Sequence, residues 1–190
     1  MNLQIGQAPS PTFAEPLELL SDCHRRVEFF LGVLARVGAD ASDTGLSTPE
    51  REALTTALRY FREAAPKHTA DEEDSLFPRL RQSGHPLAAT VLAQVEALEA
   101  DHAAAAADHN EVEACGQAWL SAGNLDAEAR ARFCAAVERL QARYRPHIAL
   151  EDGTVFPVAA SILSAADLAE VGGEMARRRG LRQRRHDSSP

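Results

Sequence analysis

Apolar residues recur along most of this chain at intervals of three and four, the spacing that gathers them on one face of an α-helix. The first such run predicts a helix over about residues 15–38. Its apolar positions are Leu17, Leu20, Val27, Phe30, Leu31 and Leu34. Because similar runs follow through most of the sequence, the pattern favours an all-α fold.

Turn and capping residues divide the remaining chain into further helices. Ser47, Pro49 and Glu50 together form a helix start, with an N-cap, a first-turn proline and the acid of a capping box. The second helix is then predicted to run to Arg81. Further helices are predicted over about residues 86–121, 126–152 and 165–179, after the turn sequences QSGHP, SAGNLD and LSAAD.

Two prolines fall inside these predicted helices. Pro66 lies in the second helix and Pro146 in the fourth, each shortly before a histidine. A proline inside a helix removes one backbone donor and bends the helix axis. We expect the two bends to direct His68 and His147 towards the interior.

The sequence from His68, HTADEEDSLFP, has the same layout as the sequence from His147, HIALEDGTVFP. In both, a glutamate follows the histidine by four positions and Phe-Pro closes the segment. Nearly the same offset relates His24, which ends LLSDCH, to His102, which ends ALEADH. Each half thus contains a helix with one histidine and a helix with His-x-x-x-Glu. We therefore predict two helical hairpins that pack as an antiparallel up-down four-helix bundle, followed by a short extra C-terminal helix.

Composition agrees with one folded unit between two tails. The 190 residues are 45% hydrophobic and 25% charged, and many of the apolar residues are alanine, which favours helices. The predicted order is a flexible N-terminal arm (1–14), the bundle (15–163), the C-terminal helix (164–180) and a disordered tail (181–190).

Charge and motif content argue against several classes of protein. A net charge of −8 disfavours nucleic-acid binding, and no long apolar run predicts a membrane span. The start, MNLQIGQAPSPTF, has neither a basic segment nor an apolar one, so we expect no secretory signal. The three cysteines follow no C-x-x-C spacing and are expected to be buried free thiols of a cytoplasmic protein. We expect a monomer or a small homo-oligomer.

The repeated histidine and glutamate pairs carry the candidate chemistry. Residues four apart on a helix share a face, so each glutamate points the same way as its histidine. A single such pair is most often solvated, but the repetition and the adjoining Leu-Phe and Val-Phe residues indicate a buried setting. Burying imidazoles and carboxylates without partners costs several kcal/mol per group, which a metal ion would offset. The candidate metal ligands are His24, His68, Glu72, His102, His147 and Glu151.

The number and type of these ligands favour a pair of metals. Six nitrogen and oxygen ligands are too many for one tetrahedral zinc ion, and no thiolate belongs to the set. Two metals that share both carboxylates, with two histidines each and an oxo or hydroxo bridge, use all six residues and leave open positions. Such ligation suits redox iron first and manganese second.

This arrangement resembles the hemerythrin-like (HHE cation-binding) proteins over about residues 15–160. The matching features are the order His, His-x-x-x-Glu, His, His-x-x-x-Glu and the segments EDSLFP and EDGTVFP. The resemblance implies an antiparallel four-helix bundle around a non-haem, oxo-bridged di-iron centre. The implied assignment is one iron on His24 and His68 and one on His102 and His147, with Glu72 and Glu151 as bridges.

Two positions depart from the oxygen-carrying hemerythrins. Those proteins place a fifth histidine one turn after the ligand of the third helix, and this chain has Ala106 there. Their second bridging acid is an aspartate at a longer spacing, whereas this chain has Glu151. The lost nitrogen ligand would open the second iron, so oxygen transport is the less favoured role. Ferritin-like di-iron proteins match less well, because they need two Glu-x-x-His motifs and Glu99 with His102 is the one such spacing in this set.

Four further residues could act around the centre. His109 lies two turns beyond His102 and is expected at the surface or behind the ligands, with a proton relay or a gas-channel gate as the alternative. Tyr144 is expected to pack in the core, or to hydrogen-bond towards the centre. Glu73 and Asp152 follow the two bridging acids and are expected to be solvated, or to hold ligand histidines by hydrogen bonds.

These features support two main functional hypotheses. An open di-iron site can bind peroxide, dioxygen or nitric oxide, and catalase- or peroxidase-like turnover in oxidative or nitrosative stress is the favoured form. The alternative is an iron-binding protein that senses a gas or iron, or delivers iron for iron–sulfur cluster repair. A bundle whose metals serve its stability alone is a third interpretation. The predicted partners are a small diatomic or peroxide ligand and an unidentified redox partner, without nucleic acid or membrane.

Overall fold

The computed structural model describes residues 12–41 and 45–181, and nearly all of them are helical. Residues 1–11 of the predicted arm and 182–190 of the predicted tail lie outside the described part. Among the helices described, none is both long enough and apolar enough to cross a membrane.

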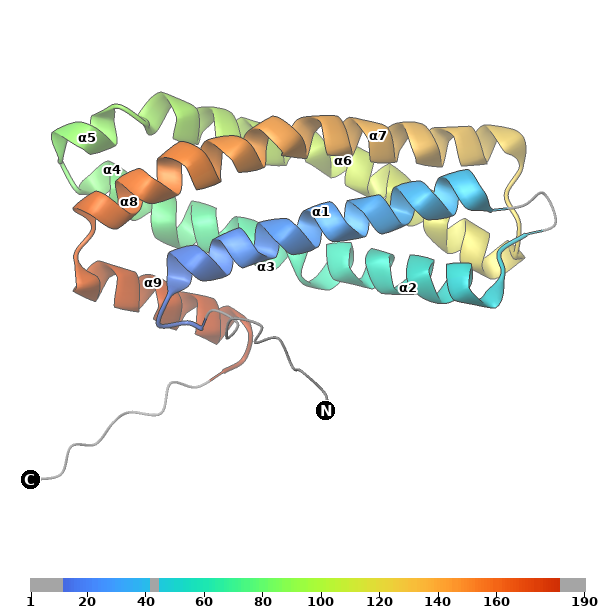
Figure 1. The fold of residues 1–190 in the computed structure, drawn as a ribbon, viewed down its shortest axis with the longest axis horizontal. Coiled ribbons are helices and arrows are strands. Elements are labelled where there is room, and N and C mark those ends of the chain that lie inside the picture. The colour runs from blue at the N-terminus through green and yellow to red at the C-terminus, as the bar shows by residue number, and fades with distance from the viewer. Residues whose placement is uncertain (1–11, 42–44, 182–190) are drawn as a thin grey trace, which may run out of the picture.

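Four helical segments run along the length of the molecule, and successive segments run in opposite directions (Figure 1). The first is α1 (Pro16–Asp40). The second consists of α2 (Thr48–Glu63), α3 (Ala65–Asp71), the π-helix η1 (Glu72–Leu76) and α4 (Phe77–Gln82). The third consists of α5 (Pro86–Ala89) and α6 (Leu92–Ala122). The fourth consists of α7 (Ala127–Leu150), the π-helix η2 (Glu151–Val155) and α8 (Phe156–Ile162).

Each long helix packs against two others, since α1 and α6 both contact α2 and α7. The last helix, α9 (Ala165–Arg178), folds back against α1 and α3. The chain therefore has the all-α bundle and the short extra C-terminal helix that the sequence predicts.

Local signals start the helices where the sequence predicts. The Ser47 side chain accepts a hydrogen bond from the Glu50 backbone N–H, and the Glu50 carboxylate accepts one from the Ser47 N–H at 2.7 Å, which completes a capping box. Ser164 and Asp167 form the same box before α9. At the end of α6, Gly123 adopts a left-handed conformation with φ of 80°, which glycine tolerates without strain.

The second segment differs from the single predicted helix to Arg81, because it breaks at Ala64. Pro66 lies in the first turn of the new helix α3, where a missing N–H leaves no hydrogen bond unmade. Pro146 behaves differently. It lies inside α7, which continues to Leu150.

The third and fourth segments also have boundaries that the sequence misplaces. The short α5 is separate, so the main third helix begins at Leu92 and not near residue 86. The fourth segment does not end near residue 152 but runs to Ile162, because the π-helix η2 carries the chain past Gly153.

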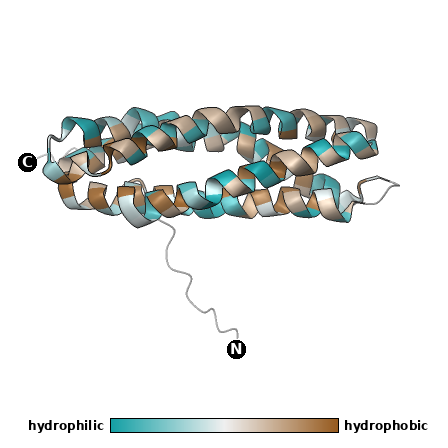
Figure 2. Cartoon of the chain, turned by 90° about the horizontal axis from the view of Figure 1, so that it is seen from above, coloured by the Kyte–Doolittle hydropathy of each residue, from teal (hydrophilic) through white to brown (hydrophobic). Residues whose placement is uncertain are grey.

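The apolar interior has two clusters, one towards each end of the bundle. The first joins α1, α2, α6 and α7, and the second joins the opposite ends of the segments with α9. Polar and apolar residues accordingly alternate along the helices in an amphipathic pattern (Figure 2). Leu34, Leu54, Trp119 and Phe133 belong to the first cluster, and Leu20, Phe77, Val155 and Met175 to the second. Between them lies a belt of buried histidines and acids.

Candidate metal centre

The six predicted ligands meet in this buried belt. His24 comes from α1, His68 from α3, His102 from α6 and His147 from α7, while Glu72 and Glu151 are the first residues of η1 and η2. Each of the six side chains is at most 7% exposed. The helical hairpins of both halves therefore contribute equally to one interior site.

Both glutamates open a π-helical turn, a feature that the sequence did not predict. The backbone N–H of Phe77 donates to the carbonyl of Glu72, and that of Phe156 donates to the carbonyl of Glu151. Such a turn holds one residue more than an α-helical turn, and π-turns inside helices are frequent at functional sites. Here they direct both glutamates and both phenylalanines inwards, since all four residues are 4% exposed or less.

One ligand group consists of His24, His68 and Glu72. Oε1 of Glu72 lies 3.3 Å from Nε2 of His68 and 3.6 Å from Nε2 of His24. The other consists of His102, His147 and Glu151. Within each group the ligand atoms lie within 4.8 Å of one another, so each group could hold one cation.

Each glutamate also reaches the other group. Oε2 of Glu72 lies 3.6 Å from Nε2 of His102. Oε2 of Glu151 lies 3.2 Å from Nε2 of His147 and 3.0 Å from Nε2 of His24. Both carboxylates therefore lie close to histidines of both groups.

Close as these atoms are, several of them form no hydrogen bond. In the described part of the chain, both carboxylate oxygens of Glu72 and of Glu151 lack a hydrogen-bond partner, as do Nε2 of His24 and Nε2 of His147. Buried polar atoms without partners are costly and rare in proteins. Cations between the imidazoles and the carboxylates would satisfy all of them, so the residues fit a metal centre.

The electrostatics of the site also favour cations. Burial raises the pKa of Glu72 well above its usual value, and the charge of Glu151 raises it further. Burial lowers the pKa of His68 to about 3. Burial would likewise lower the pKa of His24, but Glu151 and Glu72 outweigh it and raise this pKa to about 10. Without metal, the site therefore retains protons that an incoming cation must displace.

A second layer of acids orients two of the histidines. Nδ1 of His24 lies 3.0 Å from Oδ1 of Asp152, and Nδ1 of His102 lies 2.8 Å from Oε1 of Glu73. Asp152 also accepts a hydrogen bond from the Ser21 hydroxyl at 2.7 Å. The expectation that these acids are merely solvated is therefore wrong. Histidines that bind metals commonly donate their second N–H to a carboxylate in this way.

The signal for these contacts was in the sequence, since an acid follows the glutamate of both motifs. A further contact had no such signal. Nδ1 of His147 lies 3.6 Å from Oδ2 of Asp101. Asp101 precedes His102, and Cys23 takes the equivalent place before His24. The two halves are therefore not identical around the site.

The cysteines are free thiols, as predicted, but only Cys23 among them is buried. Burial raises the pKa of its thiol. Cys115 and Cys134 are half-buried, so the prediction of burial is wrong for both, because they lie at the margin of the larger apolar cluster.

His109 is half-buried and lies behind the candidate ligands, one of the two places expected for it. Its Nε2 shares a hydrogen bond of 2.9 Å with the Tyr144 hydroxyl, and the Tyr144 ring meets the ring of His147 edge-on with centroids 5.8 Å apart. Tyr144 thus lies between His109 and a candidate ligand. Burial lowers the pKa of His109 to about 4.

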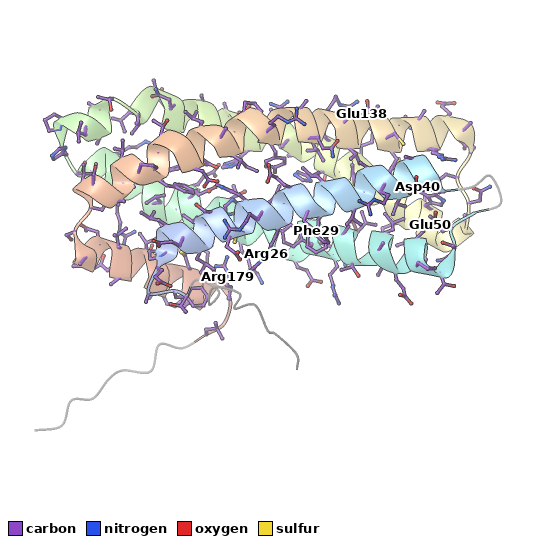
Figure 3. The ribbon with its side chains drawn as sticks, in the orientation of Figure 1. Arg26, Phe29, Asp40, Glu50, Glu138 and Arg179 are labelled. Atoms are coloured by element: carbon purple, nitrogen blue, oxygen red, sulfur yellow. The ribbon has the colours of Figure 1, made fainter. Side chains whose placement is uncertain are left out.

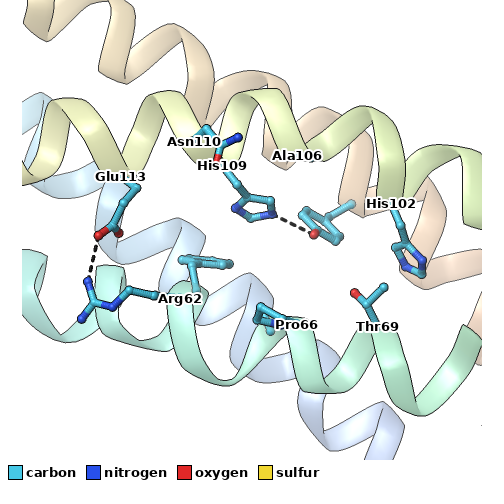
Figure 4. Close-up of a pocket in the computed structure, with 11 residues that line it drawn as sticks. Arg62, Pro66, Thr69, His102, Ala106, His109, Asn110 and Glu113 are labelled. Atoms are coloured by element: carbon cyan, nitrogen blue, oxygen red, sulfur yellow. Dashed lines mark hydrogen bonds and ion pairs between the residues drawn. The ribbon is translucent and has the colours of Figure 1, made fainter. Parts of the chain in front are cut away.

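A pocket of about 420 Å³ opens beside these residues (Figure 4). His102 and Thr69 lie at one end, Arg62 and Glu113 at the other, and Ala106 and His109 along α6 between them. The position where oxygen-carrying hemerythrins have a fifth histidine is therefore a small side chain that lines open space.

Comparison with known proteins agrees with this geometry. Residues 15–159 match the hemerythrin HHE cation-binding domain. The chain belongs to this family. An uncharacterized protein of Haemophilus influenzae is 28% identical over 172 residues, which cover 90% of this chain and 94% of that protein. The chain thus contains an HHE cation-binding domain, and the His and Glu groups in the bundle interior are its candidate metal site.

Proposed function

We propose that this HHE domain holds two iron ions bridged by Glu72, Glu151 and an oxo or hydroxo group, and that it disproportionates hydrogen peroxide. One observation supports the presence of two metal ions. The two oxygens of Glu72 face different histidine groups, and Oε2 of Glu151 lies between His24 and His147. A single tetrahedral ion would leave part of this set without a partner.

The pocket beside His102 supports reaction with a small molecule. When bound, an iron pair would supply reversible two-electron redox chemistry. Two hydrogen peroxide molecules then give two waters and one dioxygen. One peroxide takes up two electrons and two protons, and the other gives them up, so that no additional reductant is needed. The chain's own residues position the centre and give the peroxide a route to it.

The same pocket also supports a second candidate function. Because it reaches His102, it offers an exit for the ion of the second group, as iron sensing or iron delivery would require. Retention of iron distinguishes the two functions. A catalyst keeps its metals through turnover, whereas a donor yields them to a chelator.

The first experiment is metal analysis of the iron-loaded protein and three variants. We expect two irons per wild-type chain, and one or none for Glu72→Ala and Glu151→Ala. The matched control is Glu113→Ala, because His109 and Glu113 repeat the His-x-x-x-Glu spacing outside the site. Two irons and an unchanged oxo-to-iron absorption band in Glu151→Ala would show that this glutamate is not a bridge.

The second experiment adds hydrogen peroxide to the iron-loaded protein and follows oxygen with an electrode. Repeated turnover with both irons retained supports the proposal. No oxygen release, together with rapid loss of iron to a chelator, supports iron delivery instead.

A further inference from the structure

The pocket next to His102 is larger than the proposed peroxide needs. Its volume is about 420 Å³, whereas one water molecule occupies about 30 Å³ of liquid and hydrogen peroxide is only slightly larger. A channel for peroxide alone would need a small part of this space. The remaining volume is sufficient for a molecule with a ring or a short branched chain.

One wall of the pocket is apolar. Phe61 and Pro66 come from the second helical segment, and Ala106 faces them from α6. Ala106 is exposed, and its small methyl side chain lines the pocket. This wall can contact the apolar body of a ligand.

The end of the pocket nearest the candidate metal site is lined by polar groups. His102 and Thr69 line the inner end, and the hydrogen-bonded pair of His109 and Tyr144 lies beside them. A hydroxyl can both donate to and accept from such groups. The apolar wall and the polar end together therefore match a molecule with an apolar body and one hydroxyl or hydroperoxyl group.

The pocket offers little to a charged ligand. Arg62 at its outer end is paired with Glu113 at 2.8 Å, so that the two formal charges cancel. His109 is neutral at pH 7, since burial lowers its pKa to about 4. An anion or a cation would lose its hydration without gaining an opposite charge.

We propose that this pocket binds small uncharged organic molecules that carry a hydroxyl or hydroperoxyl group, with that group directed towards His102. The role of this binding rests on the proposed function. If the centre reacts with hydrogen peroxide, the pocket would also admit organic hydroperoxides to it. The binding itself depends on the pocket and can be measured without turnover.

The test uses 2-phenyl-2-propanol, the unreactive alcohol that corresponds to cumene hydroperoxide. Its binding to the full chain, as purified and after iron loading, is measured by calorimetry or by saturation-transfer NMR. We expect a Kd of about 1 mM or tighter, as the size of the ligand allows. Ala106→Phe should fill the pocket and weaken binding at least tenfold.

The control is Ala104→Phe, which changes another exposed alanine of the same run that does not line the pocket; this variant should bind as the wild type does. Tyr144→Phe should weaken binding several-fold, since it removes the hydroxyl but keeps the ring. Benzoate should bind the metal-free protein at least tenfold more weakly than the alcohol. No binding to the wild type, equal binding to Ala106→Phe, or preference for benzoate would overturn the inference.

The two proposals fail separately. Binding of the alcohol without any release of oxygen from peroxide would contradict the proposed catalysis and leave the pocket assignment standing. Release of oxygen without binding of the alcohol would contradict the pocket assignment alone.

Discussion

At the scale of single residues, Asp152 and Glu73 orient two of the candidate ligand histidines. Asp152 belongs to the second half of the chain but holds His24 of the first, and Glu73 of the first half holds His102 of the second. Each acid directly follows one of the two candidate ligand glutamates, Glu72 and Glu151. One turn of helix therefore supplies a candidate metal ligand and a partner for a histidine of the opposite hairpin, and that partner fixes the tautomer and orientation of the histidine.

Removing either acid should weaken iron binding without removing a ligand. We expect Glu73→Ala and Asp152→Ala each to lower iron affinity about 10- to 100-fold, the usual cost of losing such a partner. Glu73→Gln should lose less, because its amide oxygen still accepts from His102. The measurement is competition with a chelator of known affinity.

Asp74→Ala is the matched control, because Asp74 adjoins Glu73 but its side chain is 68% exposed. Affinity of both acid variants equal to that of Asp74→Ala would mean that these hydrogen bonds do not support the metal site.

At the scale of elements, the sequence predicts what local chemistry determines and misses what tertiary packing determines. The capping box of Ser47 and Glu50 is local, and it was predicted correctly. The π-helices were not, because EEDSL and EDGTV share no composition that marks a π-turn. Only the placement of each glutamate and phenylalanine in the packed bundle makes the wider turn favourable.

The candidate site was easier to predict than the element boundaries. The repeat in each half indicates the six candidate ligands, which the structure brings together in the interior, because two copies of His-x-x-x-Glu before Phe-Pro are hard to explain as surface pairs. The hydrogen bond of His109 was not predictable, since Tyr144, its partner, lies on another helix. A contact between helices distant in sequence leaves no spacing pattern.

The contact between α9 and the bundle gives a prediction at this scale. Asp71, which precedes Glu72, is fully buried and accepts hydrogen bonds from Arg178 at 2.9 Å and Arg179 at 2.7 Å. Arg179 is labelled at the end of α9 in Figure 3. Asp71→Ala would leave both guanidinium groups without this partner, and we expect it to lower the free energy of unfolding by about 3 kcal/mol.

Urea denaturation followed by circular dichroism measures this loss. The control is Glu170→Ala, which removes another ion pair of α9, with Arg79, but from an acid that is 71% exposed. We expect that control to cost about 0.5 kcal/mol or less. Equal losses in the two variants would contradict the view that burial makes the Asp71 contact the stronger one.

At the scale of the whole molecule, two apolar clusters hold a polar belt between them. The clusters supply the stability of the bundle, and the belt costs stability unless its groups are satisfied. In the metal-free protein, bound protons satisfy some of the buried groups of the belt. Cations would satisfy more of them, because they neutralise both glutamates at once and provide the imidazoles with partners.

This exchange of protons for cations predicts a dependence of stability on pH. The pKa of His24 is raised to about 10 in the folded metal-free protein, so the folded state holds this proton more tightly than the unfolded state. The resulting stabilisation is fully present below the unfolded pKa of about 6.5 and is lost as pH rises towards 10. Glu72, whose pKa is also raised, acts in the same direction.

We therefore expect metal-free protein to lose up to about 2 kcal/mol of stability between pH 7 and pH 8.5. His109 does not contribute over this range. Its pKa is lowered to about 4, so its titration changes the stability only below pH 6.5. Iron-loaded protein should show almost no loss over this range, since the cation has already displaced the protons. Calorimetric scans of both forms in matched buffers make the measurement, and His24→Gln should flatten the curve of the metal-free form. Parallel curves for the two forms would mean that metal and protons do not compete for the same buried groups.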